Sequence, residues 1–177
     1  MASAGQKIRN PVTGENITFL ETAADSNGRI LRLEMVTDPG STGAGEHVHP
    51  RSTERYDVKE GKLHVWLGDD EHVLGQGTKL EIPPGTRHRF ATPEAEPARV
   101  LCEFEPAGRF EYFMETVYRL AGEGKTNAGG TPKNILQAAV IGHAHVNDIA
   151  LPRIPVFLQR LLFAAVAPIG RLFGYSA

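Results

Sequence analysis

Three residues of metal-binding type lie close together in the first third of the chain. His47 and His49 are two positions apart, and Glu54 follows them. Side chains along a strand alternate between its two faces, so His47 and His49 point the same way and their imidazoles can share one ion. Two histidines and a carboxylate that leave coordination positions open are typical of a non-haem metal that activates a substrate or oxygen. His88, further along the chain, is the fourth candidate ligand.

Such a site needs strands to hold it, and the surrounding residues predict them. In residues 62–67, Leu63, Val65 and Leu67 share one face of a strand. Similar segments recur, are short, and are separated by turns rich in Gly and Pro, as in an all-β sandwich or barrel. After a polar lead-in over residues 1–15, the predicted strands cover residues 17–20, 28–37, 54–59, 62–67, 71–74, 78–82, 88–92 and 97–105.

The pattern changes from strand to helix after Pro106. Residues 109–121 carry apolar side chains at helical spacing and predict an amphipathic helix. The Gly-rich residues 122–132 predict a flexible loop, with the alternative of a lid near the barrel mouth, and residues 134–141 predict a second helix capped by Asn134. We therefore expect a β-barrel domain over residues 1–106 and a helical extension over residues 107–177, packed on the barrel or on a partner subunit.

A second His-x-His pair, His143 and His145, lies where the second predicted helix ends. Residues two apart do not share a face of a helix, and no carboxylate follows at the spacing that separates Glu54 from His49. We therefore expect these two histidines to belong to a solvated helix end and not to a metal site.

The last apolar stretch, residues 154–173, raises the question of a membrane. It is rich in Leu, Phe, Val and Ala, but Arg160, Arg171, Pro155 and Pro168 interrupt it, which argues against a spanning helix. A surface anchor in a membrane is the less favoured alternative. We expect burial of this stretch against the barrel or in a homodimer.

The composition narrows the class of protein. The chain has 177 residues, 41% of them hydrophobic, which suits a folded domain with a core. The formal net charge of −2 gives no reason to expect nucleic acid as a partner. The single cysteine, Cys102, excludes an internal disulfide framework, and no apolar run near the N-terminus resembles a secretory signal. These features predict a cytoplasmic protein.

Two motifs in this chain resemble those of the cupin superfamily. The first is His47-x-His49-x4-Glu54-x6-Gly61, and the second is Gly77-x5-Pro83-x-Gly85-xx-His88. The chain departs from the family pattern at Ser41, where a glycine is expected, and at Thr92, where the family has Asn. Neither position is a ligand, and the two motifs in order over residues 28–106 make the resemblance specific.

The resemblance implies a fold and a cofactor. The fold is the cupin double-stranded β-helix, a small jelly-roll barrel, in a single-domain monocupin. His47, His49, Glu54 and His88 would bind one divalent transition metal ion, and this donor set suits Fe, Mn, Ni, Co or Zn without choosing among them. An empty polar pocket is the alternative to a bound metal.

The resemblance leaves the activity more open than the metal. A weak similarity of residues 108–116 to quercetinase-like monocupins favours a dioxygenase-type oxygenase, with Glu54 as both ligand and catalytic base. A non-catalytic cupin that binds a small ligand or a protein partner, and a metal-dependent isomerase or decarboxylase, are the alternatives. Strand alternation predicts an apolar pocket wall, also explicable as plain barrel core, that suits a small apolar or aromatic substrate. The predicted wall and substrate-binding residues are Leu33, Met35, Tyr56, Leu63, Phe90, Thr92, Val100, Cys102 and Phe104.

Overall fold

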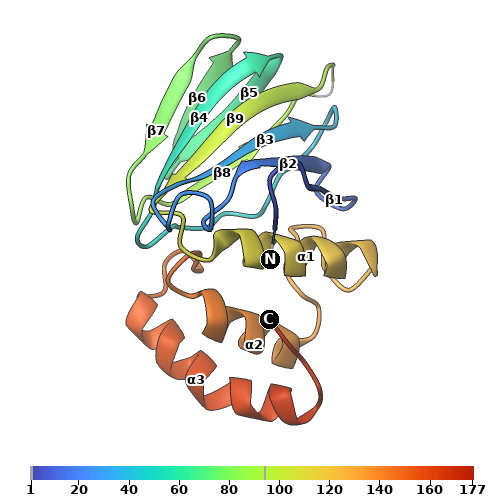
Figure 1. Ribbon diagram of the computed structural model, residues 1–177, viewed down its shortest axis with the longest axis vertical. Coiled ribbons are helices and arrows are strands. Elements are labelled where there is room, and N and C mark those ends of the chain that lie inside the picture. The colour runs from blue at the N-terminus through green and yellow to red at the C-terminus, as the bar shows by residue number, and fades with distance from the viewer. Residues whose placement is uncertain (1, 94) are drawn as a thin grey trace.

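Nine strands form two antiparallel sheets in the computed structural model, which describes residues 2–93 and 95–177. Figure 1 shows the strands above three helices, one of which lies next to the strands and the other two below it. The larger sheet has the order β1-β2-β3-β9-β4-β7, and the smaller sheet has the order β6-β5-β8. The strands are β1 (Lys7–Asn10), β2 (Glu15–Glu21), β3 (Leu31–Thr37), β4 (Thr53–Glu60), β5 (Lys62–Leu67), β6 (Asp70–Gly75), β7 (Lys79–Ile82), β8 (His88–Ala91) and β9 (Ala98–Glu105).

The core lies between the two sheets, where alternate side chains of each strand are buried. In β9 the buried positions are every second residue, and Val100 pairs with Val58 of β4. The smaller sheet contributes Leu63 and Val65, which are also fully buried. This period-two pattern is the one on which the strand predictions depend, and the all-β prediction with a helical extension is confirmed. The main addition is β1, which pairs with β2 within the predicted lead-in.

Gly61 makes the tight turn between β4 and β5. Its φ of +72° is in the left-handed region that non-glycine residues rarely adopt. A Cβ atom at this position would lie 2.2 Å from the carbonyl oxygen of Pro97, which is backbone and cannot move aside cheaply. The turn therefore requires glycine for two separate reasons, and it fixes where β4 begins its return as β5.

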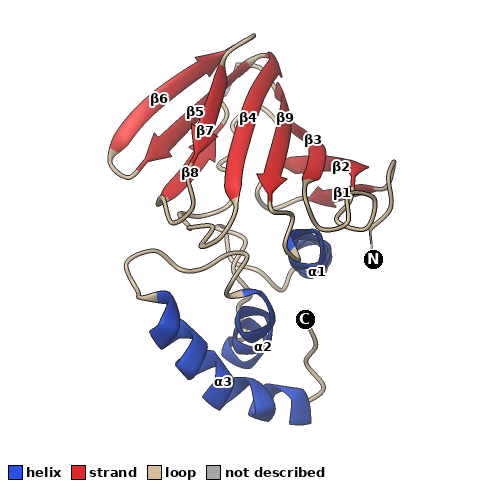
Figure 2. Cartoon of the chain, turned by 60° about the vertical axis from the view of Figure 1, so that its left-hand side comes forward, coloured by secondary structure: helices blue, strands red, loops and turns tan. Residues whose placement is uncertain are grey.

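Three helices follow the strands. They are α1 (Phe110–Gly122), α2 (Ile135–His145) and α3 (Val156–Leu172). Helix α1 lies directly beneath the larger sheet (Figure 2), and its apolar residues, among them Met114 and Val117, join the barrel core. The predicted cap of α2 is confirmed, because Asn134 Oδ1 accepts hydrogen bonds from the backbone N–H groups of Leu136 and Gln137.

Helix α3 packs along α2 through small residues. A Cβ atom on Gly170 would lie 2.7 Å from Val140 Cγ2, and one on Gly142 would lie 2.6 Å from the ring of Phe163.

The opposite face of α3 is exposed and apolar, so the structure does not bury this stretch against the barrel as predicted. Burial in a homodimer stays a prediction. Of the described helices, none is long and apolar enough to cross a membrane. The exposed large residues of α3 and its flanks are Leu151, Ile154, Phe157, Leu158, Leu161, Leu162, Ile169, Leu172 and Phe173.

Candidate metal centre and its cavity

The four candidate ligands meet inside the barrel. His47 and His49 precede β4, Glu54 is the second residue of β4, and His88 begins β8. All four are buried, and one ligand atom from each lies within 4.8 Å of those from the others. His47 and His88 exchange two backbone hydrogen bonds of 3.0 Å, which joins the two motifs directly. Buried His47, His49, Glu54 and His88 could thus hold one metal ion.

Each imidazole is oriented by a backbone carbonyl. A carbonyl oxygen can only accept, so the Nδ1 atom of each ring must carry the proton, and the Nε2 atom of a neutral ring then presents its lone pair. This is the arrangement that second-shell partners of metal-bound histidines usually impose. The distances are 2.8 Å from His47 Nδ1 to Gly45 O, 2.6 Å from His49 Nδ1 to Asp148 O and 2.8 Å from His88 Nδ1 to Thr86 O.

The inner atoms of the cluster are left without hydrogen-bond donors. Within the described residues, His49 Nε2, Glu54 Oε2 and His88 Nε2 are buried and have no hydrogen-bond partner when the rings are neutral. His88 Nε2 lies 2.8 Å from Glu54 Oε2, and His49 Nε2 lies 3.5 Å from it. Lone pairs that face each other at this distance need a proton or a cation between them. The residues therefore fit a divalent transition metal, by donor type as well as by position.

The electrostatics of the metal-free cluster place one proton on it. Burial raises the pKa of Glu54, but the hydrogen bond from His88 and the nearby imidazoles outweigh burial and lower this pKa to about 2. Burial lowers the pKa of His88, yet the hydrogen bond and charge of Glu54 outweigh it and raise this pKa above 6.5. Burial and the charges of neighbouring histidines lower the pKa of His47 well below 6.5, and burial likewise lowers the pKa of His49. The proton is therefore held by His88.

Metal affinity is expected to depend on pH through this one proton. A metal must displace it, so the affinity should fall about tenfold for each pH unit below the raised pKa of His88 and level off above it. Glu54 stays ionised in this range and His47 stays neutral, so neither adds to the slope. Competition with a chelating dye between pH 8 and pH 5.5 measures this slope. An affinity that did not change with pH, or that fell with the slope of three protons, would contradict the assignment.

The helical extension takes part in the site. Asp148, in the turn after α2, supplies the carbonyl oxygen that orients His49. Two residues further on, Ala150 forms an antiparallel bridge with Val48, with hydrogen bonds of 3.1 Å and 3.0 Å. The segment that carries the His-x-His motif is thus paired on one side with His88 of the barrel and on the other with the extension.

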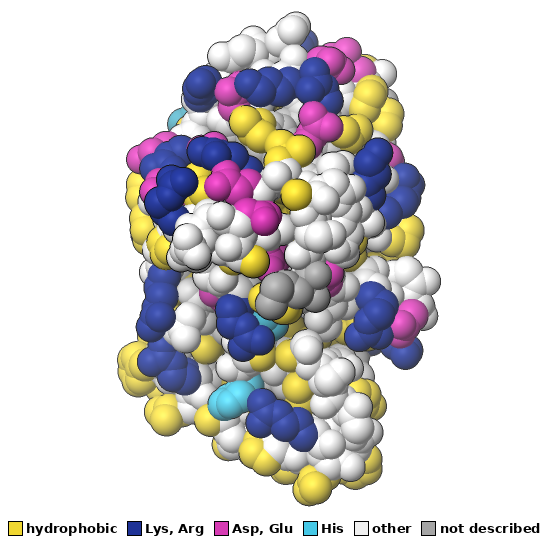
Figure 3. Space-filling view, in the orientation of Figure 1, with side chains coloured by type: hydrophobic (Ala, Val, Ile, Leu, Met, Phe, Trp, Pro, Cys, Tyr) yellow, Lys and Arg dark blue, Asp and Glu magenta, His cyan; other side chains and the backbone are white. Residues whose placement is uncertain are grey.

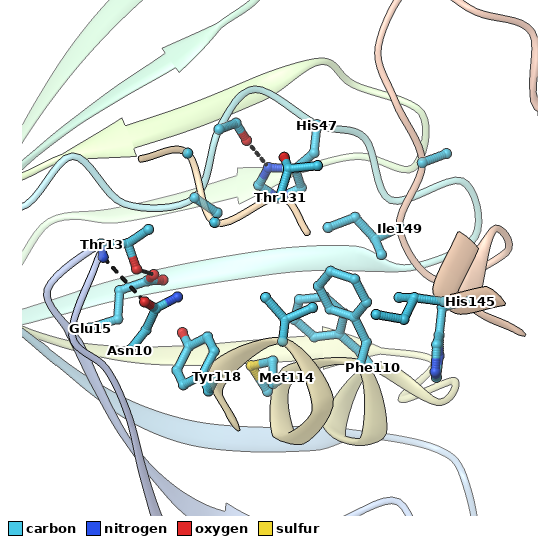
Figure 4. Close-up of a pocket in the computed structure, with 18 of the residues that line it drawn as sticks. Asn10, Thr13, Glu15, His47, Phe110, Met114, Tyr118, Thr131, His145 and Ile149 are labelled. Carbon is cyan, nitrogen blue, oxygen red and sulfur yellow. Dashed lines mark hydrogen bonds between the residues drawn. The ribbon is translucent and has the colours of Figure 1, made fainter. Parts of the chain in front are cut away.

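A cavity of about 270 Å³ lies next to the ligand cluster and is lined mainly by apolar and aromatic side chains. His47 and Glu54 reach its wall, and residues 129–132 of the predicted flexible loop border it. Figure 4 shows His47 and Thr131 on one side of the cavity and Phe110 and Met114 of α1 on another. The cavity therefore lies between the barrel and the three helices of the extension, each of which contributes lining residues.

The predicted substrate-binding residues divide into two groups. Tyr56, Phe90, Cys102 and Phe104 line the cavity, as do the wall residues Leu33 and Met35. Leu63, Thr92 and Val100 are buried but are not among the lining residues. Thr92 instead donates a hydrogen bond of 2.6 Å from Oγ1 to Thr37 Oγ1, inside the barrel wall. Substrate binding by any of these residues stays a prediction, as does the role of Glu54 as a base.

The prediction of a solvated helix end was wrong for His145. Helix α2 continues one turn beyond residue 141, and this turn carries His145 onto the inner side, where it is buried and lines the cavity. Its ring lies 5.9 Å from that of Phe113. The spacing of Ile141 and His145, four residues apart on one helix face, was the signal that could have found it.

Two further polar residues of the cavity were not predicted from the sequence. Glu15, the first residue of β2, and Tyr118 of α1 are both buried and both line the cavity. The predicted strand began at Ile17, so the alternation that turns Glu15 inward, with Ile17 and Phe19, was not followed back far enough.

Comparison with known proteins supports the fold. Residues 33–104 match the family described as "Cupin domain". An RmlC-like cupin from Shewanella frigidimarina is 24% identical, with a TM-score of 0.51 over 63% of this chain and 94% of that protein. KdgF from Halomonas sp. is 20% identical, with a TM-score of 0.50 over 57% and 88% of the two chains. The cupin domain of Cnp3 from Schizosaccharomyces pombe is 9% identical, with a TM-score of 0.50 over 57% and 68%. No protein with a curated description matches the chain.

Proposed function

The chain belongs to the cupin superfamily, and from this premise we propose that it is a metal-dependent oxygenase of the dioxygenase type. Its substrate is a small apolar or aromatic molecule that carries an oxygen able to approach the metal, such as an enol or a phenol. O2 is the oxidant, and both of its oxygen atoms enter the product. The ion is Fe, Mn, Ni, Co or Zn.

One observation supports this proposal above all. Three buried imidazoles and a carboxylate that is ionised at neutral pH converge at the wall of a cavity whose other surfaces are mostly apolar. An apolar cavity with a few polar groups is the usual form of a small-molecule site. A sugar phosphate would find no cationic side chain there, because no Lys or Arg is among the lining residues.

Each part of the site has a distinct task. When bound, a divalent metal supplies Lewis acidity and open coordination positions. Glu54 offers a carboxylate on the cavity side of the cluster, where it can also hold a proton taken from the substrate hydroxyl. Tyr56, Phe90 and Phe104 give an aromatic substrate flat surfaces to pack on and exclude water from the reacting end.

Metal analysis followed by oxygen consumption tests the proposal. The purified protein is expected to hold about one transition metal ion per chain, and the loaded protein to consume O2 with at least one member of a panel of flavonols, diketones and catechols. The matched control is His64→Ala, which removes a half-buried histidine of β5 outside the ligand cluster and should leave consumption unchanged. Full metal loading without oxygen consumption from any panel member would overturn the oxygenase assignment.

A further inference from the structure

A buried acidic group lies in the cavity apart from the metal cluster. Glu15 is 5% exposed, and Figure 4 shows it grouped with Asn10, Thr13 and Tyr118, away from His47. Thr13 Oγ1 donates a hydrogen bond to Glu15 Oε2, and the side chain of Tyr118 is hydrogen-bonded to the same carboxyl group. These four residues, which we call the Glu15 cluster, all line the cavity.

The Glu15 cluster has no cation to neutralise a carboxylate. Among the described residues, no Lys, Arg or His forms an ion pair with Glu15, although most acidic groups of the barrel surface have such a partner, as Glu103 has in Arg32. Burial raises the pKa of Glu15, and its hydrogen bonds to Thr13 and Tyr118 offset this only in part. Burial therefore favours the neutral acid more at Glu15 than at an exposed carboxyl group, and a neutral acid can both donate and accept a hydrogen bond.

Burying an acidic group beside an apolar cavity costs free energy unless hydrogen bonds or a charged partner compensate for the lost hydration. The surrounding wall includes Ile17, Met114 and Val117, none of which can hydrogen-bond. A carboxyl group can form more hydrogen bonds than the two with Thr13 and Tyr118, and Glu15 lines the cavity in which a ligand would lie. The metal cluster and the Glu15 cluster are therefore two separate polar regions of the cavity wall, which also includes Glu46, Thr131, His145 and Gln159.

We propose that the Glu15 cluster is a recognition site for a second polar group of the substrate, a neutral hydroxyl, carbonyl or amide. The substrate then has an apolar or aromatic body, one oxygen that approaches the metal cluster, and a neutral hydrogen-bonding group on the part of the molecule that lies against Glu15. An anionic group in this position is disfavoured because the wall around Glu15 is mostly apolar and no Lys or Arg is among the lining residues. In this view Glu15 positions the substrate and determines specificity. The inference rests on the proposed function, because it takes the metal cluster as the first of the two polar regions.

A pair of matched probes tests the inference. Benzohydroxamates chelate transition metals, so they anchor at the metal cluster, and their ring can carry at the meta or para carbon either a hydroxyl group or a methyl group of nearly equal size. With the metal-loaded protein, either the meta- or the para-hydroxyl probe, whichever binds more tightly, is expected to bind about tenfold more tightly than the methyl probe substituted at the same carbon. This difference corresponds to roughly one net hydrogen bond. The corresponding carboxylate probe is expected to bind least well. Calorimetry measures the affinities directly, without any turnover.

Variants assign the preference to the cluster. Glu15→Ala is expected to reduce the hydroxyl-to-methyl ratio to about one, and Glu15→Gln to retain a ratio of a few-fold, since an amide still hydrogen-bonds. The matched control is Met114→Leu, which changes the same cavity without a polar group and should affect both probes alike. Thermal melting of each variant confirms that it is folded, and Glu15→Gln keeps the test possible if Glu15→Ala is not.

The outcomes separate this inference from the proposed function. A ratio near one in the wild-type protein, or a ratio that survives Glu15→Ala, overturns the recognition role and leaves Glu15 as a structural residue. A failure of the metal assignment would instead weaken both probes together and remove the difference between metal-loaded and metal-free protein. The ratio of the two probes thus reports on the Glu15 cluster, and their shared metal dependence reports on the metal cluster.

Discussion

Replacing His49 by alanine is expected to lower the affinity for metal by more than about 100-fold, because loss of a second-shell partner alone costs 10- to 100-fold. His49 supplies one of four converging ligand atoms, and its Nε2 has no other partner in the described structure. Elemental analysis after dialysis should find about one ion per chain in the wild type and close to none in His49→Ala. His64→Ala is the control, because His64 is outside the cluster and pairs with Glu71.

The control also guards against a trivial loss of folding. Circular dichroism establishes whether both histidine variants are folded, which matters because His49 is buried and its ring packs against Phe104 and Phe110. Stoichiometric metal in folded His49→Ala would contradict the assignment of this site. Loss of metal from both His49→Ala and His64→Ala would indicate that the metal binds at a site other than the four-ligand cluster.

Substituting Gly61 by alanine is expected to destabilise the protein by about 3 kcal/mol, since a left-handed conformation and overpacking each cost roughly 1–3 kcal/mol. The φ of Gly61 is +72°, and the added Cβ atom would meet the carbonyl oxygen of Pro97 at 2.2 Å. Chemical denaturation of the wild type and the variant measures the difference in the free energy of unfolding.

Two other glycines separate the two causes. Gly77 has a φ of +80° but open space around it, so Gly77→Ala should lose only the conformational term, about 1–2 kcal/mol. Gly75 has neither a positive φ nor a neighbour within 4 Å, so Gly75→Ala should change the stability little. Equal losses at Gly61 and Gly77 would show that the contact with Pro97 is unimportant.

The parts of the fold and site that were predictable are those that local sequence encodes. Strand alternation places Leu63 and Val65 in the core from their spacing alone. The two motifs bring His47, His49 and His88 together because each motif fixes its own turn and its own face of a strand. Strand alternation and motif spacing are both short-range rules, so they can be applied without knowledge of the tertiary structure.

The parts that were missed depend on long-range contacts or on the ends of elements. The carbonyl oxygen of Asp148 orients His49 from 99 residues away. Every residue has a backbone carbonyl group, so the residue type does not reveal this role. Glu15 and His145 were missed because β2 begins two residues earlier, and α2 ends one turn later, than predicted. Element boundaries are the least certain product of a sequence pattern, and here they decide which polar side chains face the cavity.

The bridge between Val48 and Ala150 connects the segment that carries His47 and His49 to the helical extension. Opening of the helical layer breaks this bridge and the hydrogen bond that holds His49, so it also dismantles the ligand set. By thermodynamic linkage, any free energy gained from metal binding must then oppose local unfolding of residues 148–150, and with it the release of α2 and α3 from the barrel. A bound metal ion would therefore also stabilise the packing of α2 and α3 against the barrel, on one side of the cavity.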